Sequence, residues 1–90
     1  MAITITNGAS GLIKVAVGTW HKDGSDDYYT IEQGNTETWS RSDSRGYLMA
    51  VQGQAKTNEY YISPSSKIVI EDNLVKDHGQ SISPLMLVNA

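Results

Sequence analysis

This chain of 90 residues contains no cysteine, so no disulfide bond can support its core. A chain of this size buries only roughly 60 to 65% of the surface that its unfolded form exposes, and the core is therefore thin. Stability must come from good sheet packing or from a partner subunit. The sequence shows no linker, low-complexity tract or internal repeat, which predicts a single domain over residues 1–90.

Two further absences limit the partners of the chain. There is no excess of basic residues, and a net charge of -3 removes the attraction to phosphate that supports nucleic-acid binding. No apolar run approaches the roughly 20 residues of a membrane span, and the first residues lack the basic start and apolar stretch of a secretory signal. We therefore expect no nucleic-acid partner and no transmembrane segment. We also expect a protein that is cytoplasmic as synthesised, or released without a signal peptide.

The sequence also lacks the motifs of a catalytic or metal centre. No serine lies in the context of a nucleophile elbow. His21 and His78 are far apart, and there is no cysteine to complete a zinc site. Asp23, Asp26 and Asp27 lack the spacing of an EF-hand loop, so we expect them to cap turns in a polar loop. The sequence therefore predicts a non-enzymatic protein without a metal or cofactor.

Apolar and polar residues alternate with period two along most of the chain, whereas the helical period is almost absent. Gly, Asn, Ser and Pro turns separate the alternating stretches about every 8 to 12 residues. This pattern predicts an all-β fold, a small antiparallel β-sandwich or small barrel of seven or eight short strands. We expect a hairpin turn at 33–35, burial of both faces of the strand at 47–51, and irregular structure at 73–83. The expected strands are 2–6, 12–20, 27–32, 35–41, 47–51, 59–63, 67–72 and 85–88.

The aromatic residues are two Trp and five Tyr, with no Phe, so every aromatic side chain carries a polar group. Such side chains are enriched where proteins meet ligands, although tyrosines can also pack in a core with their hydroxyls at its edge. Trp39 alternates with Glu37 and Arg41 on one face of its strand, so we expect this face to meet water. Trp39 is therefore a candidate for binding.

The residues that follow Trp39 form a charged group in which Asp43 can accept hydrogen bonds from Arg41 or Arg45. One interpretation is an ion-pair cluster that fixes a surface corner, at under about 1 kcal/mol per exposed pair. The other is a ligand site, because arginines and a carboxylate beside an aromatic ring can hold a sugar, an acidic sugar or a lipid phosphate. The predicted ligand-binding residues are Trp39, Arg41, Asp43 and Arg45, with stacking from Tyr28, Trp20 or Tyr60.

Four stretches together carry a resemblance to a known family. They are Asn-x-x-Ser-Gly at 7–11, Trp-x-Lys-Asp-Gly-Ser-Asp at 20–26, Ile-x-x-Gly at 31–34 and SRSDSRGYLMAV at 40–51. In this order they resemble the aegerolysins of fungi and bacteria, and more distantly the actinoporin-like proteins and the fungal fruit-body lectins. The resemblance covers residues 1–51. The chain departs from these families in its short length, its lack of cysteine and the absence of an amphipathic N-terminal helix.

The resemblance implies a non-enzymatic, defence-related protein with a β-sandwich fold that recognises cell-surface glycans or lipid head groups. The departures argue against pore formation by this chain alone. We therefore expect a lectin-like protein that binds glycans. Binding of sphingolipid or phosphocholine head groups is one alternative, and a subunit-interaction role for the apolar residues 85–88 is another. A homodimer or higher homo-oligomer is expected in each case, because shallow sites gain from multivalency.

Overall fold

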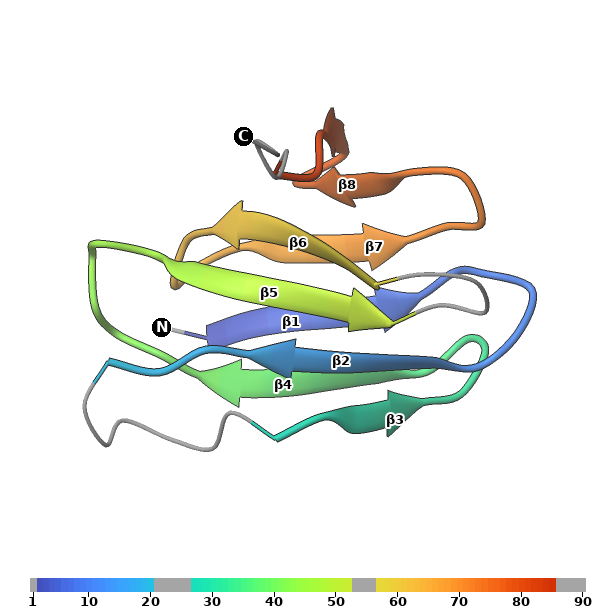
Figure 1. Cartoon of the computed structure of the whole chain (residues 1–90), viewed down its shortest axis with the longest axis horizontal. Coiled ribbons are helices and arrows are strands. Elements are labelled where there is room, and N and C mark those ends of the chain that lie inside the picture. The colour runs from blue at the N-terminus through green and yellow to red at the C-terminus, as the bar shows by residue number, and fades with distance from the viewer. Residues whose placement is uncertain (1, 21–26, 53–56, 86–90) are drawn as a thin grey trace, which may run out of the picture.

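The computed structural model describes residues 2–20, 27–52 and 57–85, which form nine β-strands (Figure 1). The prediction of an all-β chain is confirmed, with two short strands that the sequence pattern did not indicate. The strands are β1 (Ala2–Asn7), β2 (Ile13–Val17), β3 (Tyr29–Ile31), β4 (Thr36–Ser40), β5 (Tyr47–Gln52), β6 (Thr57–Ile62), β7 (Lys67–Ile70), β8 (Val75–Asp77) and β9 (Gln80–Ile82).

The strands form two sheets that pack face to face. The five-stranded sheet has the order β4-β1-β7-β8-β9, and the four-stranded sheet has the order β3-β2-β5-β6. In Figure 1, β2 and β5 lie in front of β4 and β1. All neighbours are antiparallel except β1 and β7, which are parallel. Two open sheets rather than a closed barrel confirm the predicted small sandwich.

Strand β1 shows how the alternating pattern produces the layers. Ile3 and Ile5 are fully buried between the sheets, and Thr4 and Thr6, which alternate with them, point outward. Thr6 lies opposite Thr36 of β4, and their hydroxyl oxygens are 2.7 Å apart. The β-branched side chains suit a strand with one buried face, as the sequence predicted.

The turn at 33–35 does not close the hairpin that we expected. Strand β3 pairs with β2 and β4 pairs with β1, so the turn carries the chain from one sheet to the other. Asn7 fixes this crossing through its backbone, because its N–H donates to Asn35 O and its carbonyl accepts from Gly34 N. Its buried side chain donates to Ile31 O and Gly11 O. The hydrogen bonds of Asn7 therefore hold the crossing in place, as the backbone hydrogen bonds of a hairpin would have held its turn.

Residues 73–83 were predicted to be irregular, and this is wrong. Strands β8 and β9 form a hairpin whose two turn residues, His78 and Gly79, have φ angles of 51° and 82°. A two-residue turn with both φ values positive matches the twist of antiparallel strands. The His-Gly pair is a weaker turn signal than Asn-Gly, and each strand has only three residues. The sequence pattern is therefore too short to reveal this hairpin.

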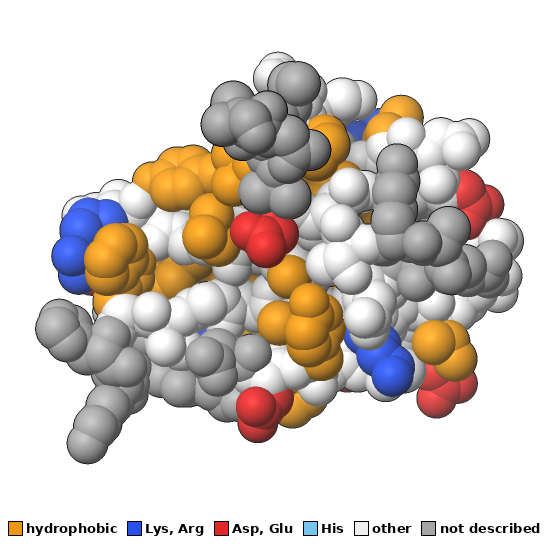
Figure 2. All heavy atoms as spheres, viewed as in Figure 1, with side chains coloured by type: hydrophobic (Ala, Val, Ile, Leu, Met, Phe, Trp, Pro, Cys, Tyr) orange, Lys and Arg blue, Asp and Glu red, His pale blue; other side chains and the backbone are white. Residues whose placement is uncertain are grey.

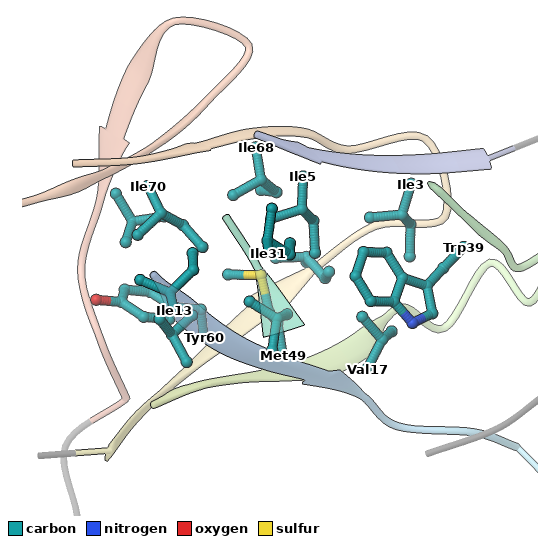
Figure 3. Packing of buried hydrophobic residues seen from close by; sticks show 14 of the residues in the cluster. Ile3, Ile5, Ile13, Val17, Ile31, Trp39, Met49, Tyr60, Ile68 and Ile70 are labelled. Carbon is teal, nitrogen blue, oxygen red and sulfur yellow. The ribbon is translucent and has the colours of Figure 1, made fainter. Parts of the chain in front are cut away.

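One cluster of buried apolar side chains fills the space between the sheets (Figure 3). Strand β5 contributes Tyr47, Met49 and Val51 to it, while Leu48 is 49% exposed. The expectation that this strand is buried on both faces is therefore wrong. The outer face of the four-stranded sheet is not covered by another described element, so Leu48 faces solvent there.

Some expected features fall outside the described residues. They are residues 21–26 of the polar loop expected at 21–27, residues 54–56 of a hairpin loop expected at 54–58, and residues 86–88 of the C-terminal strand expected at 85–88. Leu85 is described, and its backbone N–H donates to Glu59 O of β6 at 2.7 Å.

Candidate binding surface

Trp39 lies in the core rather than at the surface. It is 6% exposed, and its indole packs among Ile3 and Val17 (Figure 3). The Tyr29 ring meets it edge-on, with 6.0 Å between ring centroids. The expectation that this face meets water is wrong, because β4 turns the face with Trp39 toward the opposite sheet. Glu37, on the same face, stays exposed at the open end of β4.

Arg41 is also buried, at 4% exposure. Its Nε donates to Gly18 O and its Nη2 to Val17 O, each at 3.1 Å, and its Nη1 donates to Ser40 O at 3.0 Å. The guanidinium carbon is 5.8 Å from the centroid of the Tyr47 ring. These contacts tie the end of β4 to the end of β2 and supply donors to the Val17 and Gly18 carbonyls. The geometry of Arg41 is that of a structural residue.

Asp43 and Arg45 form the corner between β4 and β5. Asp43 Oδ1 accepts from the Arg45 backbone N–H at 2.9 Å, and Asp43 Oδ2 accepts from Arg45 Nη2 at 2.6 Å. Arg45 Nε adds contacts of 3.0 and 3.2 Å to the two carboxylate oxygens. Hydrogen bonding to Asp43 raises the pKa of Arg45. The bidentate pair therefore presents a fixed, nearly neutral group at the surface.

Trp20 joins this corner from the end of β2. The Arg45 guanidinium carbon lies 3.6 Å from the centroid of the Trp20 ring, which is the geometry of a cation–π contact. Trp20 Nε1 donates to Gly46 O at 2.6 Å. Trp20 is 36% exposed, and 54% of the Arg45 side chain is exposed. The structure thus brings together three of the predicted ligand-binding residues, namely Trp20, Asp43 and Arg45.

Tyr61 belongs to the same corner, although it is not among the residues predicted from the sequence. It lies opposite Leu48 on the outer face of the four-stranded sheet, and its hydroxyl donates to Arg45 O. It is 59% exposed. The only sequence signal was its place beside Tyr60, because alternation sends one of two adjacent tyrosines outward. Which of the two faces outward depends on the register of β6.

The other two predicted residues lie elsewhere. Tyr60 faces the core at 5% exposure, where burial raises its pKa and a hydrogen bond with Asn58 opposes that shift. Tyr28 is exposed beside β3, at the opposite edge of the sheet from β6.

We define the corner patch as Trp20, Arg45, Leu48 and Tyr61. Each of the four side chains is at least one third exposed, and all come from one end of the four-stranded sheet. Figure 2 shows a basic group and several hydrophobic side chains gathered at the left of this face. The corner patch is held in place because the side chains of Trp20, Arg45 and Tyr61 each donate a hydrogen bond within the chain. The Tyr61 ring and the part of the Trp20 ring that Arg45 does not cover remain for contact with a ligand.

Gly46 allows this close arrangement. Its φ is +90°, and a Cβ at this position would collide with the Tyr61 hydroxyl and would lie 2.8 Å from Ile62 O. Only glycine fits both the backbone angle and the space. Gly46 is therefore what lets Tyr61 approach the corner.

Among the described residues, no group of three or more His, Asp or Glu side chains is placed to hold a metal ion. The described part of the chain likewise contains no helix that is both long and apolar enough to cross a membrane. Comparison with models of protein families, with curated proteins and with solved structures finds no match to this chain. Function is therefore inferred from the geometry of the corner patch.

Proposed function

We propose that this protein is a non-enzymatic, lectin-like protein that binds a neutral glycan at the corner patch. The observation that carries the proposal is the exposed and prearranged Trp20–Arg45–Tyr61 group. Apolar faces of sugar rings pack against aromatic rings, and rings that are already held in place lose little conformational freedom on binding. Such a patch suits a shallow site on a sheet rather than a catalytic cleft.

The ion pair favours a neutral sugar over an acidic one. Arg45 Nε and Nη2 both face the Asp43 carboxylate, so an anionic ligand would have to compete with Asp43 for them. A neutral sugar hydroxyl can instead accept from the remaining guanidinium N–H groups or donate to the carboxylate. The proposed ligand is therefore a neutral hexose or an oligosaccharide with a neutral terminal residue.

Lipid recognition is a second candidate, favoured by Leu48. This aliphatic side chain is 49% exposed beside Tyr61, and a sugar ring does not require it. Leucine next to tryptophan and tyrosine suits the boundary between head groups and acyl chains of a membrane. The same apolar surface also suits contact with a second copy of the chain, which is the third candidate.

A glycan array tests the first candidate, with Tyr61→Ala as the main variant. We expect wild-type protein to bind neutral glycans and Tyr61→Ala to lose about fivefold in affinity, because one stacked aromatic contributes on the order of 1 kcal/mol. Leu12→Ala is the matched control, since Leu12 is an exposed side chain at the opposite end of β2. No bound glycan, or equal binding by Tyr61→Ala, would reject the proposal.

Two further measurements separate the alternatives. Sedimentation with vesicles that contain sphingomyelin and phosphatidylcholine should retain wild-type protein only if the patch binds lipid, and Leu48→Ser should then release it. Light scattering gives the mass in solution. If the patch joins two copies, Leu48→Ser should convert a dimer to a monomer.

A further inference from the structure

A second surface feature lies away from the corner patch. A cavity of about 580 Å³ opens at the end of the sandwich where β2 begins, and both sheets line it. The four-stranded sheet contributes Ile13 and Tyr60, and the five-stranded sheet contributes Ile70 and Val75. Figure 3 shows Ile13, Tyr60 and Ile70 grouped at this end of the core. The volume lies within the range of about 300 to 1,000 Å³ that is typical of small-molecule sites.

The cavity offers an apolar lining at two depths. Ile13, Ile70 and Val75 are buried side chains of the core. Leu12 and Leu74 also line it but are 58% and 37% exposed. The exposed side chains of Leu12 and Leu74 favour an apolar ligand, because a ligand that covers them removes apolar surface from solvent.

The polar groups of the cavity carry an unbalanced negative charge. Glu71 is paired with Lys76, with 3.3 Å between Oε2 and Nζ. Asp72 Oδ1 accepts from the backbone N–H and the hydroxyl of Ser10, at 2.9 and 3.0 Å. Within the described ranges, no residue donates to Asp72 Oδ2 and no cation pairs with it. The carboxylate can therefore accept hydrogen bonds from a ligand that carries a positive charge.

We propose that this cavity binds a small amphiphile with an apolar body and an ammonium head group. The body lies against Leu12 and Leu74, and the head group lies beside Asp72. The site is separate from the corner patch, and its existence does not depend on glycan binding.

Three probes with the same apolar body test the proposal: octylammonium, octanol and octanoate, each below its micelle concentration. Binding to ¹⁵N-labelled protein is followed by NMR. We expect octylammonium to shift the amide signals of Ser10 and Leu74 and to bind up to about fivefold more tightly than octanol, as one partly exposed ion pair allows. Octanoate should bind more weakly than either, because Asp72 repels it.

Asp72→Asn removes the charge and keeps an oxygen that can accept from Ser10. In this variant octylammonium and octanol should bind equally. Tyr61→Ala is the control, since it alters the corner patch and should leave all three affinities unchanged. A measurement without mutation gives the same information: 1 M salt should reduce the preference for octylammonium toward unity, because it screens the charge. Equal binding of the three probes, shifts confined to other regions, or a preference that resists both salt and Asp72→Asn would overturn the proposal.

Discussion

Replacing Gly46 with alanine should destabilise the protein more than the same change at Gly34. The two glycines have similar backbone angles, with φ of +90° and +83°. Each donates its backbone N–H to a carbonyl, to Asp43 O and Asn7 O respectively. The difference between them is space, because a Cβ at Gly34 meets no atom within 4 Å. Gly34→Ala therefore measures the cost of the backbone angle alone.

The expected losses in the free energy of unfolding combine the cost of the backbone angle with the cost of the collision of the new Cβ. An alanine at positive φ costs about 1 to 2 kcal/mol, which is the expected loss for Gly34→Ala. Gly46→Ala adds the collision with Tyr61 and the approach of 2.8 Å to Ile62 O. Forcing an atom into a packed site costs about 1 to 3 kcal/mol more. The total of about 2 to 5 kcal/mol is below the stability of most small domains, so the variant can still be measured.

Urea unfolding followed by circular dichroism gives the free energy of unfolding of each variant. The m-value should stay constant, so that the change in midpoint reports stability. In a Tyr61→Ala background the extra cost at Gly46 should fall, because the ring that the new Cβ would strike is gone, but it should not vanish, because Ile62 O remains. Equal costs for Gly46→Ala and Gly34→Ala would refute the close approach of Tyr61 to the corner and, with it, the firmness of the corner patch.

Two other predictions concern side chains of the core. Trp39→Ala should lower the free energy of unfolding by about 3 to 5 kcal/mol, as for a large buried aromatic, whereas Tyr61→Ala on the surface should cost far less; similar losses in urea unfolding would contradict the buried position of Trp39. Burial raises the pKa of Tyr60 above its ordinary value, so the folded state binds the phenol proton more tightly than the unfolded state. The stability contributed by protonated Tyr60 is fully present below about pH 10 and is lost as the pH rises through the folded-state pKa. The free energy of unfolding should therefore fall less between pH 9 and pH 11 in Tyr60→Phe than in wild type.

The candidate site was only partly predictable from sequence, and Trp39 shows why. In β4 both faces carry polar residues, Thr36 and Thr38 on one and Glu37 on the other, so alternation alone does not indicate the inner face. The threonine face pairs with the outward threonines of β1, and this register turns Trp39 inward. An inward charge near the open edge, such as Glu37, also discourages pairing with another strand.

The corner patch required contacts between distant segments. Trp20, Arg45 and Tyr61 come from the end of β2, the turn before β5 and the outer face of β6. Local sequence indicated that Asp43 and Arg45 could pair, because a carboxylate two residues earlier can reach both the backbone and the side chain of the arginine. It did not indicate that the Trp20 ring lies against the Arg45 guanidinium, or that the Tyr61 hydroxyl donates to Arg45 O.

The sequence by itself determined the β class, the position of most strands and the inward isoleucines of β1, because these follow from side-chain alternation within a few residues. The tertiary structure alone decided which sheet each strand joined, that the turn at 33–35 crosses between sheets, and that β1 pairs in parallel with β7. These choices depend on burial and hydrogen bonding between residues far apart in the chain. Because these choices also set which side chains remain exposed, the tertiary structure removed Trp39 and Arg41 from the candidate site. It kept Trp20 and Arg45 there and added Tyr61.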